Sequence, residues 1–276
     1  MAVKVVTDST SDIPPELAAK LGITVIPLTV FFGDQPYKDG VDISTDEFFV
    51  RLTTGSVLPR TTQPTVGEFA EVYKPLVEAG HEVVSVHVSS KMSGTINSAL
   101  SARQEFPDAK IEVVDSGLAS MALALVAKAA AIAANGGASS EEVVKVANDT
   151  AEHIDLYFVL DTLEYLQKGG RIGRAQALLG GLLSIKPVLK VIDGEIHPHE
   201  KVRTRAKALK RMREIAAEGS PYAEIAFIHM ATPEEIAELE EYLAPLASEP
   251  LISGRIGPVI GTYTGPGVVG FALRRA

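Results

Sequence analysis

The sequence has no cysteine, and it also lacks a long, strongly apolar segment. Without cysteine, the chain has no disulfide framework, no thiolate metal site and no cysteine nucleophile. Its most apolar stretch, residues 117–137, is rich in alanine and is interrupted by Lys128. A membrane-spanning helix needs about 20 strongly apolar residues, whereas alanine favours helix and gains little on transfer to lipid. We therefore expect a buried helix there and no integral membrane segment.

The N-terminus lacks the pattern of a signal peptide. It begins MAVKVVTDST, which has no basic region followed by an apolar run. Absence of cysteine also fits a reducing compartment. These features favour a cytoplasmic location.

Positive charge is in deficit overall, with 26 Lys and Arg against 35 Asp and Glu and a formal net charge of −9. This argues against nonspecific binding to nucleic acid. The deficit is uneven, because residues 1–155 hold 11 basic and 21 acidic residues, whereas residues 168–213 hold 12 basic and three acidic ones. The basic segment indicates a local anionic partner, although a solvated helix face is the commoner explanation for such charges.

The size and patterning indicate an α/β protein with two lobes. The chain has 276 residues, of which 46% are hydrophobic and 22% charged, as in soluble globular proteins. Apolar runs alternate with amphipathic helical segments, a pattern that predicts a mostly parallel sheet covered by helices on both faces. We place the N-terminal lobe at residues 1–155 and a second α/β lobe at 156–276, with an approximate boundary. The expected strands are residues 3–7, 23–32, 82–88, 111–114, 157–160, 188–192, 224–230, 252–256 and 258–263.

Two hydroxyl-rich loops precede helices and are candidate anion sites. Residues 89–95 read SSKMSGT, and residues 60–65 read RTTQPT. The free N–H groups and the dipole at a helix start favour an anion, and hydroxyl groups add further donors. The alternative for the first loop is plain N-capping by Ser93, which is the better interpretation of that loop alone. Two such loops raise the expectation that both reach one ligand.

The remaining motifs do not indicate nucleotide binding, metal binding or catalysis. Residues 265–270 match G-x-G-x-x-G, but only six residues follow, so no βαβ unit fits and a tight turn is expected. Loop aspartates usually make turns and caps, so we expect no metal site despite five candidates. We see no pair of nucleophile and base, and we expect a protein that is not an enzyme. The candidate aspartates are Asp8, Asp12, Asp39, Asp42 and Asp115.

Seven short motifs are spread along the chain. They are TDSTSDIP at 7–14, TTQPT at 61–65, SSKMSGT at 89–95, LEYLQKGGRIG at 163–173, KP at 186–187, EKVRTR at 200–205 and TGPG at 264–267. Each motif alone is weak, but their order and spacing are specific. Through them the chain resembles the DegV family, which includes the fatty-acid-binding FakB proteins, over essentially its whole length.

The resemblance implies that the two lobes enclose one long-chain fatty acid, such as palmitate, stearate or oleate, in an apolar tunnel. Carried over to this chain, the carboxylate is held by the hydroxyls of Thr61, with Thr62, and of Ser93, while Gly94 supplies backbone. No cofactor is implied. FakB proteins present the acid to a separate ATP-dependent kinase, which makes acyl phosphate for phospholipid synthesis.

Three further positions follow from the same resemblance. Arg171 and Arg203 match basic positions at the rim, where they would serve the phosphate or the kinase. Many relatives carry histidine where this chain has Tyr263. The phenol donates one hydrogen bond but is uncharged near neutral pH. Lipid binding therefore carries over, while a pure carrier or a different kinase partner remains open.

Physical chemistry favours a fatty acid over a small anion. Each buried methylene contributes roughly 0.8 kcal/mol, so a C16 chain can supply about ten kcal/mol before ordering costs. One alternative is an enzyme for a phosphorylated or carboxylated metabolite, with residues 168–213 as its phosphate clamp. A transcriptional regulator is a weaker alternative, because the basic helix lacks a helix-turn-helix companion.

Overall fold

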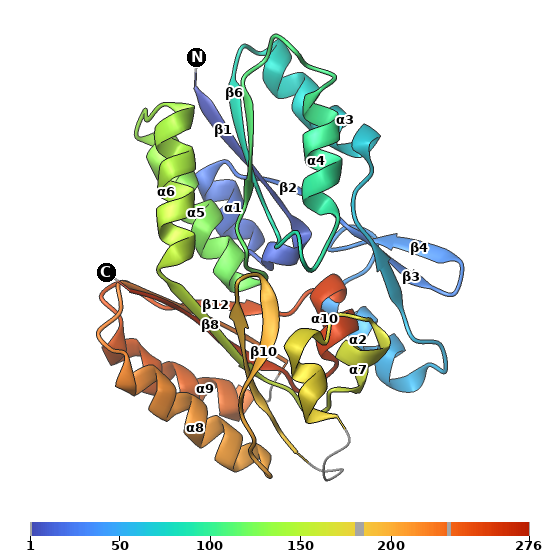
Figure 1. Cartoon of the computed structure of the whole chain (residues 1–276), viewed down its shortest axis with the longest axis vertical. Helices are drawn as coiled ribbons and strands as arrows, with labels where there is room; N and C mark the ends of the chain where they lie inside the picture. The colour runs from blue at the N-terminus through green and yellow to red at the C-terminus, as the bar shows by residue number, and fades with distance from the viewer. Residues whose placement is uncertain (1, 180–184, 231–232, 276) are drawn as a thin grey trace.

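The computed structural model describes residues 2–179, 185–230 and 233–275, which form two large sheets and one small sheet (Figure 1). Its strands are β1 (Val3–Asp8), β2 (Thr24–Ile26), β3 (Thr29–Phe32), β4 (Gln35–Lys38), β5 (Arg60–Thr62), β6 (Glu82–His87), β7 (Ile111–Asp115), β8 (Ile154–Val159), β9 (Val188–Ile192), β10 (Glu195–Glu200), β11 (Glu224–His229), β12 (Ile252–Arg255) and β13 (Val269–Arg274).

Helices connect most of these strands. The α-helices are α1 (Pro15–Leu21), α2 (Thr45–Thr54), α3 (Val66–Glu78), α4 (Thr95–Arg103), α5 (Met121–Asn135), α6 (Ser140–Glu152), α7 (Glu164–Lys168), α8 (Arg205–Glu218), α9 (Pro233–Leu243) and α10 (Pro258–Thr264). Short 3-10 turns are η1 (Ser9–Ser11), η2 (Gly173–Leu178) and η3 (Ala244–Leu246).

The first sheet is parallel throughout and has the order β2-β1-β6-β7. Helices α3 and α4 cover one face, and α1, α5 and α6 cover the other (Figure 1). This arrangement confirms the prediction of a parallel sheet between two helical layers. Parallel strands bring their carboxyl ends to one edge, where ligands of such sheets bind. The two hydroxyl-rich loops lie on the side of this sheet that faces the second one.

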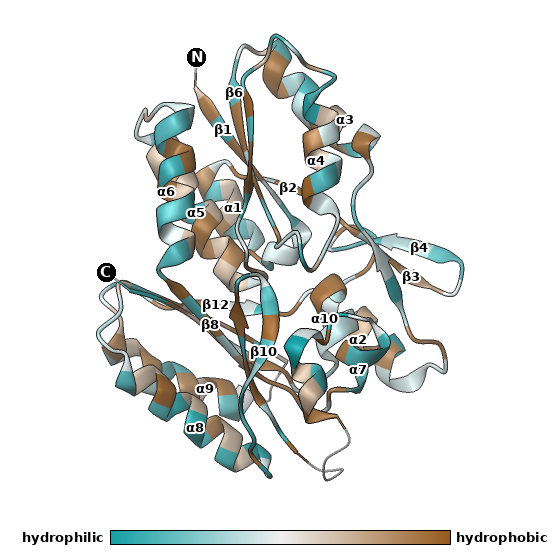
Figure 2. Ribbon diagram, in the orientation of Figure 1, coloured by the Kyte–Doolittle hydropathy of each residue, from teal (hydrophilic) through white to brown (hydrophobic). Residues whose placement is uncertain are grey.

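The second sheet has the order β10-β9-β8-β13-β11-β12, and only its β11–β12 pair is parallel. Helices α8 and α9 cover one face, as Figure 1 shows. Figure 2 shows apolar and polar residues alternating along both helices. The apolar residues Leu209, Met212 and Leu239 are buried in one cluster with residues of the sheet. The predicted lobe boundary at residues 155 and 156 falls inside β8.

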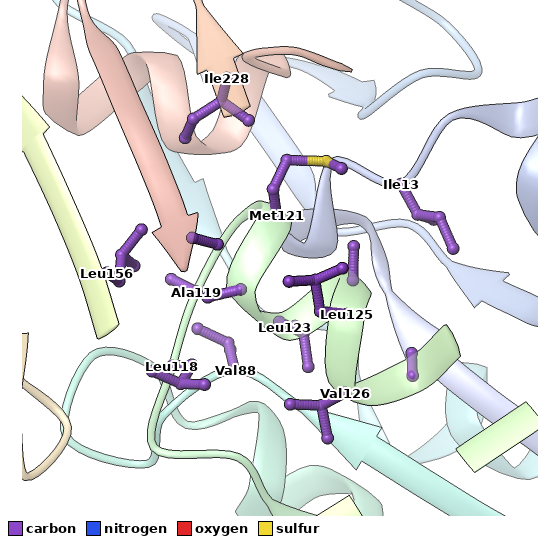
Figure 3. Packing of buried hydrophobic residues seen from close by; sticks show 14 of the residues in the cluster. Ile13, Val88, Leu118, Ala119, Met121, Leu123, Leu125, Val126, Leu156 and Ile228 are labelled. Atoms are coloured by element: carbon purple, nitrogen blue, oxygen red, sulfur yellow. The ribbon is translucent and has the colours of Figure 1, made fainter. Parts of the chain in front are cut away.

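Helix α5 is the element that both large sheets share. It contacts β1 and β6 of the first sheet and β8, β11 and β13 of the second. Ten of its fifteen residues are buried, and Figure 3 shows Met121, Leu123, Leu125 and Val126 packed in one apolar cluster. The prediction of a buried, alanine-rich helix is confirmed. The small side chains of alanine allow this close approach on two sides.

Two strand predictions were wrong. Residues 258–263 form helix α10, because Pro258 follows an N-cap at Gly257 whose N–H is held by Asp12. Residues 23–32 form two strands in different sheets, which are separated at residues 27 and 28. Four strands were not predicted, and they are β4, β5, β10 and β13. Of these, β13 follows the predicted terminal turn and lies inside the second sheet.

The spacing of Thr232 and Glu235 predicts a capping box at the start of a helix. Thr232 lies outside the described residues.

Candidate functional site

A pocket with an empty volume of about 870 Å³ lies between the two large sheets. Its wall is mainly aliphatic and is built by both halves of the chain. Figure 3 shows four of its wall residues, Val88, Ala119, Leu156 and Ile228, next to the core. The other apolar wall residues are Leu28, Met92, Phe158, Leu166, Val191, Ile196, Ile256, Val259, Ile260 and Val268. A pocket with a mostly apolar wall and a few polar groups is typical of small-molecule sites.

Polar side chains gather in one part of this wall. Thr61 on β5 and Tyr263 on α10 approach so that their hydroxyl oxygens are 2.5 Å apart. Ser93 and Gln63 line the same pocket. Of the predicted carboxylate ligands, the structure therefore brings together Thr61, Ser93 and Tyr263.

Ser93 is not the N-cap residue of α4, but its hydroxyl oxygen accepts from the N–H of Thr95, the first residue of that helix, at 3.4 Å. The N-cap is Gly94, which has no side chain. The hydroxyl oxygen of Ser93 lies 2.9 Å from that of Thr95. Ser93 therefore keeps hydrogen-bonding capacity for a ligand.

Gly94 and Gln63 fit closely together. A Cβ atom on Gly94 would lie 2.7 Å from the side-chain nitrogen of Gln63, nearer than atoms can pack. The absence of a side chain at Gly94 thus allows Gln63 to occupy the pocket wall. Sequence reasoning missed Gln63 as a site residue, although it stands inside the TTQPT motif.

Arg171 borders the polar part of the pocket from the solvent side. Its guanidinium group lies 5.0 Å from the centre of the Tyr263 ring and donates to the carbonyl oxygens of Met92 and Gly169 at 3.1 and 2.9 Å. Tyr263 in turn packs on the backbone of Gly169, where a Cβ atom would clash with the ring. Arg171 thus positions the phenol and leaves positive charge beside it.

A second, outer pocket of about 720 Å³ adjoins the first. The two share Thr61, Arg171 and Tyr263. The outer pocket also contains Arg60 and Lys168, so its wall is basic. An anion that leaves the polar part of the inner pocket would meet these cations.

Two predicted site residues lie elsewhere. Thr62 is exposed and lines neither pocket, and Arg203 is exposed before α8 and also lines neither. Much of the basic 168–213 segment is engaged in ion pairs within the protein, which agrees with a helix face more than with an anion clamp. These pairs are Lys168–Glu164, Arg174–Glu195, Lys186–Asp161, Arg205–Glu235, Arg211–Glu200 and Arg213–Glu238.

Two buried carboxyl groups hold the start of α10, the helix that carries Tyr263. Asp12 accepts hydrogen bonds from the N–H of Gly257 at 2.9 Å and from the hydroxyl of Ser120. Asp39 lies beside the same glycine, where a Cβ atom on Gly257 would meet both carboxyl groups. Burial raises the pKa of Asp12 well above its usual value and raises the pKa of Asp39 to about 7. The neighbouring Asp8 carboxylate adds to both shifts.

The loop aspartates serve as backbone acceptors rather than as metal ligands. Asp8 accepts from the N–H of Thr10 at 3.0 Å, Asp42 from the N–H of Lys38 at 2.8 Å, and Asp115 from the N–H of Gly117 at 2.9 Å. Among the described residues, no group of three or more His, Cys, Asp or Glu side chains is arranged to hold a metal ion. Within the same residues, no helix is both long and apolar enough to cross a membrane.

Comparison with known sequences gives a match along the whole chain. A family profile described as "Uncharacterised protein, DegV family" matches residues 2–276. A DegV domain-containing protein of Streptomyces coelicolor is 41% identical over 277 residues, and the alignment covers 98% of each protein.

Comparison with solved structures gives the same fold. A structure that reports fatty acid binding of a DegV family protein from Thermus thermophilus matches with a TM-score of 0.92 and 35% identity, over 100% of both chains. A stearic acid-binding protein from Eubacterium ventriosum matches with a TM-score of 0.89 and 30% identity, over 99% of this chain and 98% of that one.

Proposed function

The chain belongs to the DegV family, and from that premise we propose that it binds one long-chain fatty acid in the inner pocket. The observation that carries the proposal is the pocket itself, which is aliphatic along most of its wall and bears hydroxyl groups in one part. Similar structures bind fatty acids, among them stearic acid. Palmitate, stearate and oleate are the ligands of choice for a first test.

The pocket supplies binding energy mainly through its aliphatic wall. At roughly 0.8 kcal/mol for each buried methylene, the acyl chain provides most of the affinity. The ordering of a flexible chain opposes part of this gain. The head group therefore needs orientation more than strong attraction, and neutral donors suffice for that role.

Thr61, Ser93 and Tyr263 are the donors that we assign to the carboxylate. A carboxylate accepts only, and hydroxyl groups are suitable donors for it. Hydrogen bonds to a charged group contribute about 1.5–3 kcal/mol each. Gln63 adds an amide N–H at the same place, and Arg171 adds positive charge at the edge.

We further propose that the protein is a non-catalytic, cytoplasmic carrier that presents the carboxylate to an ATP-dependent fatty acid kinase. The support is the outer pocket, in which Arg60, Lys168 and Arg171 adjoin the proposed carboxylate site. Positive charge there suits both an acyl phosphate product and the triphosphate of the kinase. The absence of cysteine fits the reducing cytoplasm.

The test is the lipid content of the purified protein. We expect organic extraction and mass spectrometry to release about one long-chain fatty acid per chain. After delipidation, titration with oleate or palmitate should restore that stoichiometry. Absence of both bound lipid and uptake would refute the proposal. Addition of a bacterial fatty acid kinase and ATP then tests for acyl phosphate, with the protein alone as control.

A further inference from the structure

Besides the donors assigned to the carboxylate, three hydroxyl-bearing residues line the pocket: Thr10, Ser120 and Thr264. The hydroxyl of Thr264 donates to the carbonyl oxygen of Ile260 in its own helix at 3.1 Å. Thr10 belongs to η1 and Ser120 directly precedes α5, and each is only 3% exposed. The N–H of Ser120 donates to the carbonyl oxygen of Thr10 at 2.7 Å, so the two residues are neighbours. Both line the inner pocket. An apolar tail makes no hydrogen bond with them, so the acceptor capacity that their hydroxyl oxygens retain stays unused beside such a tail.

A chain of buried hydrogen bonds ends behind Thr10. The hydroxyl of Tyr73 donates to Ser85 at 2.8 Å. The hydroxyl oxygen of Ser85 lies 2.6 Å from Nε2 of His87, to which it can donate its own proton. With Nε2 as acceptor, neutral His87 carries its proton on Nδ1 and donates it to Asp8 at 2.9 Å. Every proton in this chain points toward the Asp8 carboxylate.

Asp8 consequently acts as an acceptor for all its neighbours. It receives the N–H groups of Thr10 and Val88 at 3.0 and 3.1 Å in addition to His87. The hydroxyl of Thr10 also donates to Asp8. Because its single proton is committed there, the Thr10 oxygen has only acceptor capacity left.

Ser120 has a similar arrangement. Its hydroxyl donates to Asp12, and its backbone adopts a φ of 55° and a ψ of −145°, which is strained for a residue with a side chain. Strained residues persist where the surrounding structure holds them, often at ligand sites. Thr10 and Ser120 are thus neighbours through their backbones in the wall of the inner pocket, and the hydroxyl group of each already donates to a buried carboxyl group.

We propose that Thr10 and Ser120 form a second polar subsite, which accepts a hydrogen bond from a hydroxyl group on the acyl chain. Thr10 is the fixed acceptor, because the Asp8 network commits its proton. The ligand class that fits is a long-chain fatty acid hydroxylated within the chain. This inference rests on the proposed fatty acid binding and specifies which chains the pocket prefers.

The first experiment compares stearate with hydroxystearates that carry the hydroxyl at different carbons. Each competes with a fluorescent fatty acid for the delipidated full-length protein. We expect one isomer or two adjacent isomers to bind about three- to tenfold more tightly than stearate, the gain of one hydrogen bond in a buried site. The inference is overturned if every isomer binds no better than stearate. If stearate itself does not bind, the proposed function fails instead.

The second experiment assigns the preference to Thr10. T10V removes the acceptor while nearly preserving shape, and T10S retains the hydroxyl. The measured quantity is the ratio of the dissociation constants for stearate and the preferred isomer within one variant, so a general loss of affinity cancels. We expect the ratio to fall to about one or below in T10V and to stay near its wild-type value in T10S. An unchanged ratio in folded T10V would overturn the assignment.

Should T10V not fold, S120A supplies the second measurement. Ser120 lies beside Thr10, and its removal leaves the Asp8 network intact. We expect S120A to lower the same ratio at least twofold. A ratio equal to that of the wild-type protein would contradict the subsite.

Discussion

The hydroxyl oxygen of Tyr263 lies 2.5 Å from that of Thr61, and the contact joins residues 202 positions apart in the chain. Either atom can be the donor. The two hydroxyl groups carry one proton each. One of these protons is used in the hydrogen bond between them, so the other can be donated to a ligand. The contact also fixes α10 against β5, which places both hydroxyls at the shared boundary of the inner and outer pockets.

The substitution T61V tests whether this pair binds the carboxylate. We expect fatty acid affinity to fall by about 1–3 kcal/mol, because a charged group loses a hydrogen bond and Tyr263 loses its partner. S93A should have an effect of similar size. T62V is the matched control, since Thr62 is adjacent in sequence but exposed and outside both pockets. Competition titration measures all three; equal losses in T61V and T62V would contradict the assignment.

The contact between Gly94 and Gln63 gives a second prediction. G94A adds a methyl group 2.7 Å from the Gln63 nitrogen, so the amide must leave its place in the pocket wall. Because the Gln side chain is flexible, we expect a threefold to tenfold loss of fatty acid affinity with little change in melting temperature. A second substitution of glycine by alanine, G67A, lies within α3 where the new methyl meets nothing nearer than 4.0 Å, and serves as control. If both variants bind alike, Gln63 has no role.

Local sequence signals sufficed for much of the fold. The alanine-rich segment became α5, and Thr65 with Glu68 and Ser139 with Glu142 form the capping boxes that their spacing predicts. These features depend on neighbours within one helical turn. The alternation of strands and helices likewise predicted the parallel first sheet.

The missed features depend on distant residues. Residues 258–263 are rich in residues that favour strands, yet they are helical because Asp12, some 245 positions away, holds the helix start at Gly257. Thr10 and Ser120 reach the pocket through the contact between η1 and the start of α5. No spacing in the sequence contains such contacts, so the polar subsite was not predictable. The two hydroxyl-rich loops could be recognised as candidate anion sites because each motif directly precedes a helix.

The two rim arginines of the sequence prediction should behave differently. Arg171 borders both pockets and packs on Tyr263, whereas Arg203 lines neither. We expect R171Q to reduce acyl phosphate formation by an added kinase at least tenfold, while fatty acid affinity falls less. R203Q should retain both acyl phosphate formation and fatty acid affinity, unless the kinase itself contacts residue 203. A coupled assay with kinase and ATP, together with lipid titration, separates these outcomes.

Stability should depend on pH through Asp39, which is 6% exposed and whose Oδ2 atom has no hydrogen-bond partner among the described residues. Burial raises its pKa from 3.8 to about 7, so between these values the folded state holds a proton that the unfolded state has released. Stability therefore falls as pH rises from about 4 to 7, and the loss persists above 7.

The substitution D39N removes this ionisation while preserving the shape of the side chain. We expect wild-type protein to lose up to about 4 kcal/mol more stability than D39N between pH 4 and pH 8, because the shift spans about three pH units at roughly 1.4 kcal/mol each. In D39N, Asp12 loses the contribution that the Asp39 charge makes to its raised pKa but keeps the larger contribution from burial. The difference between the melting curves of the two proteins therefore reports the ionisation of Asp39 together with its coupling to Asp12. Thermal unfolding measured at one-unit pH steps tests this. If the stability of the two proteins changed with pH in parallel, Asp39 would ionise in the folded protein at little cost in free energy. The start of α10 would then be held in another way.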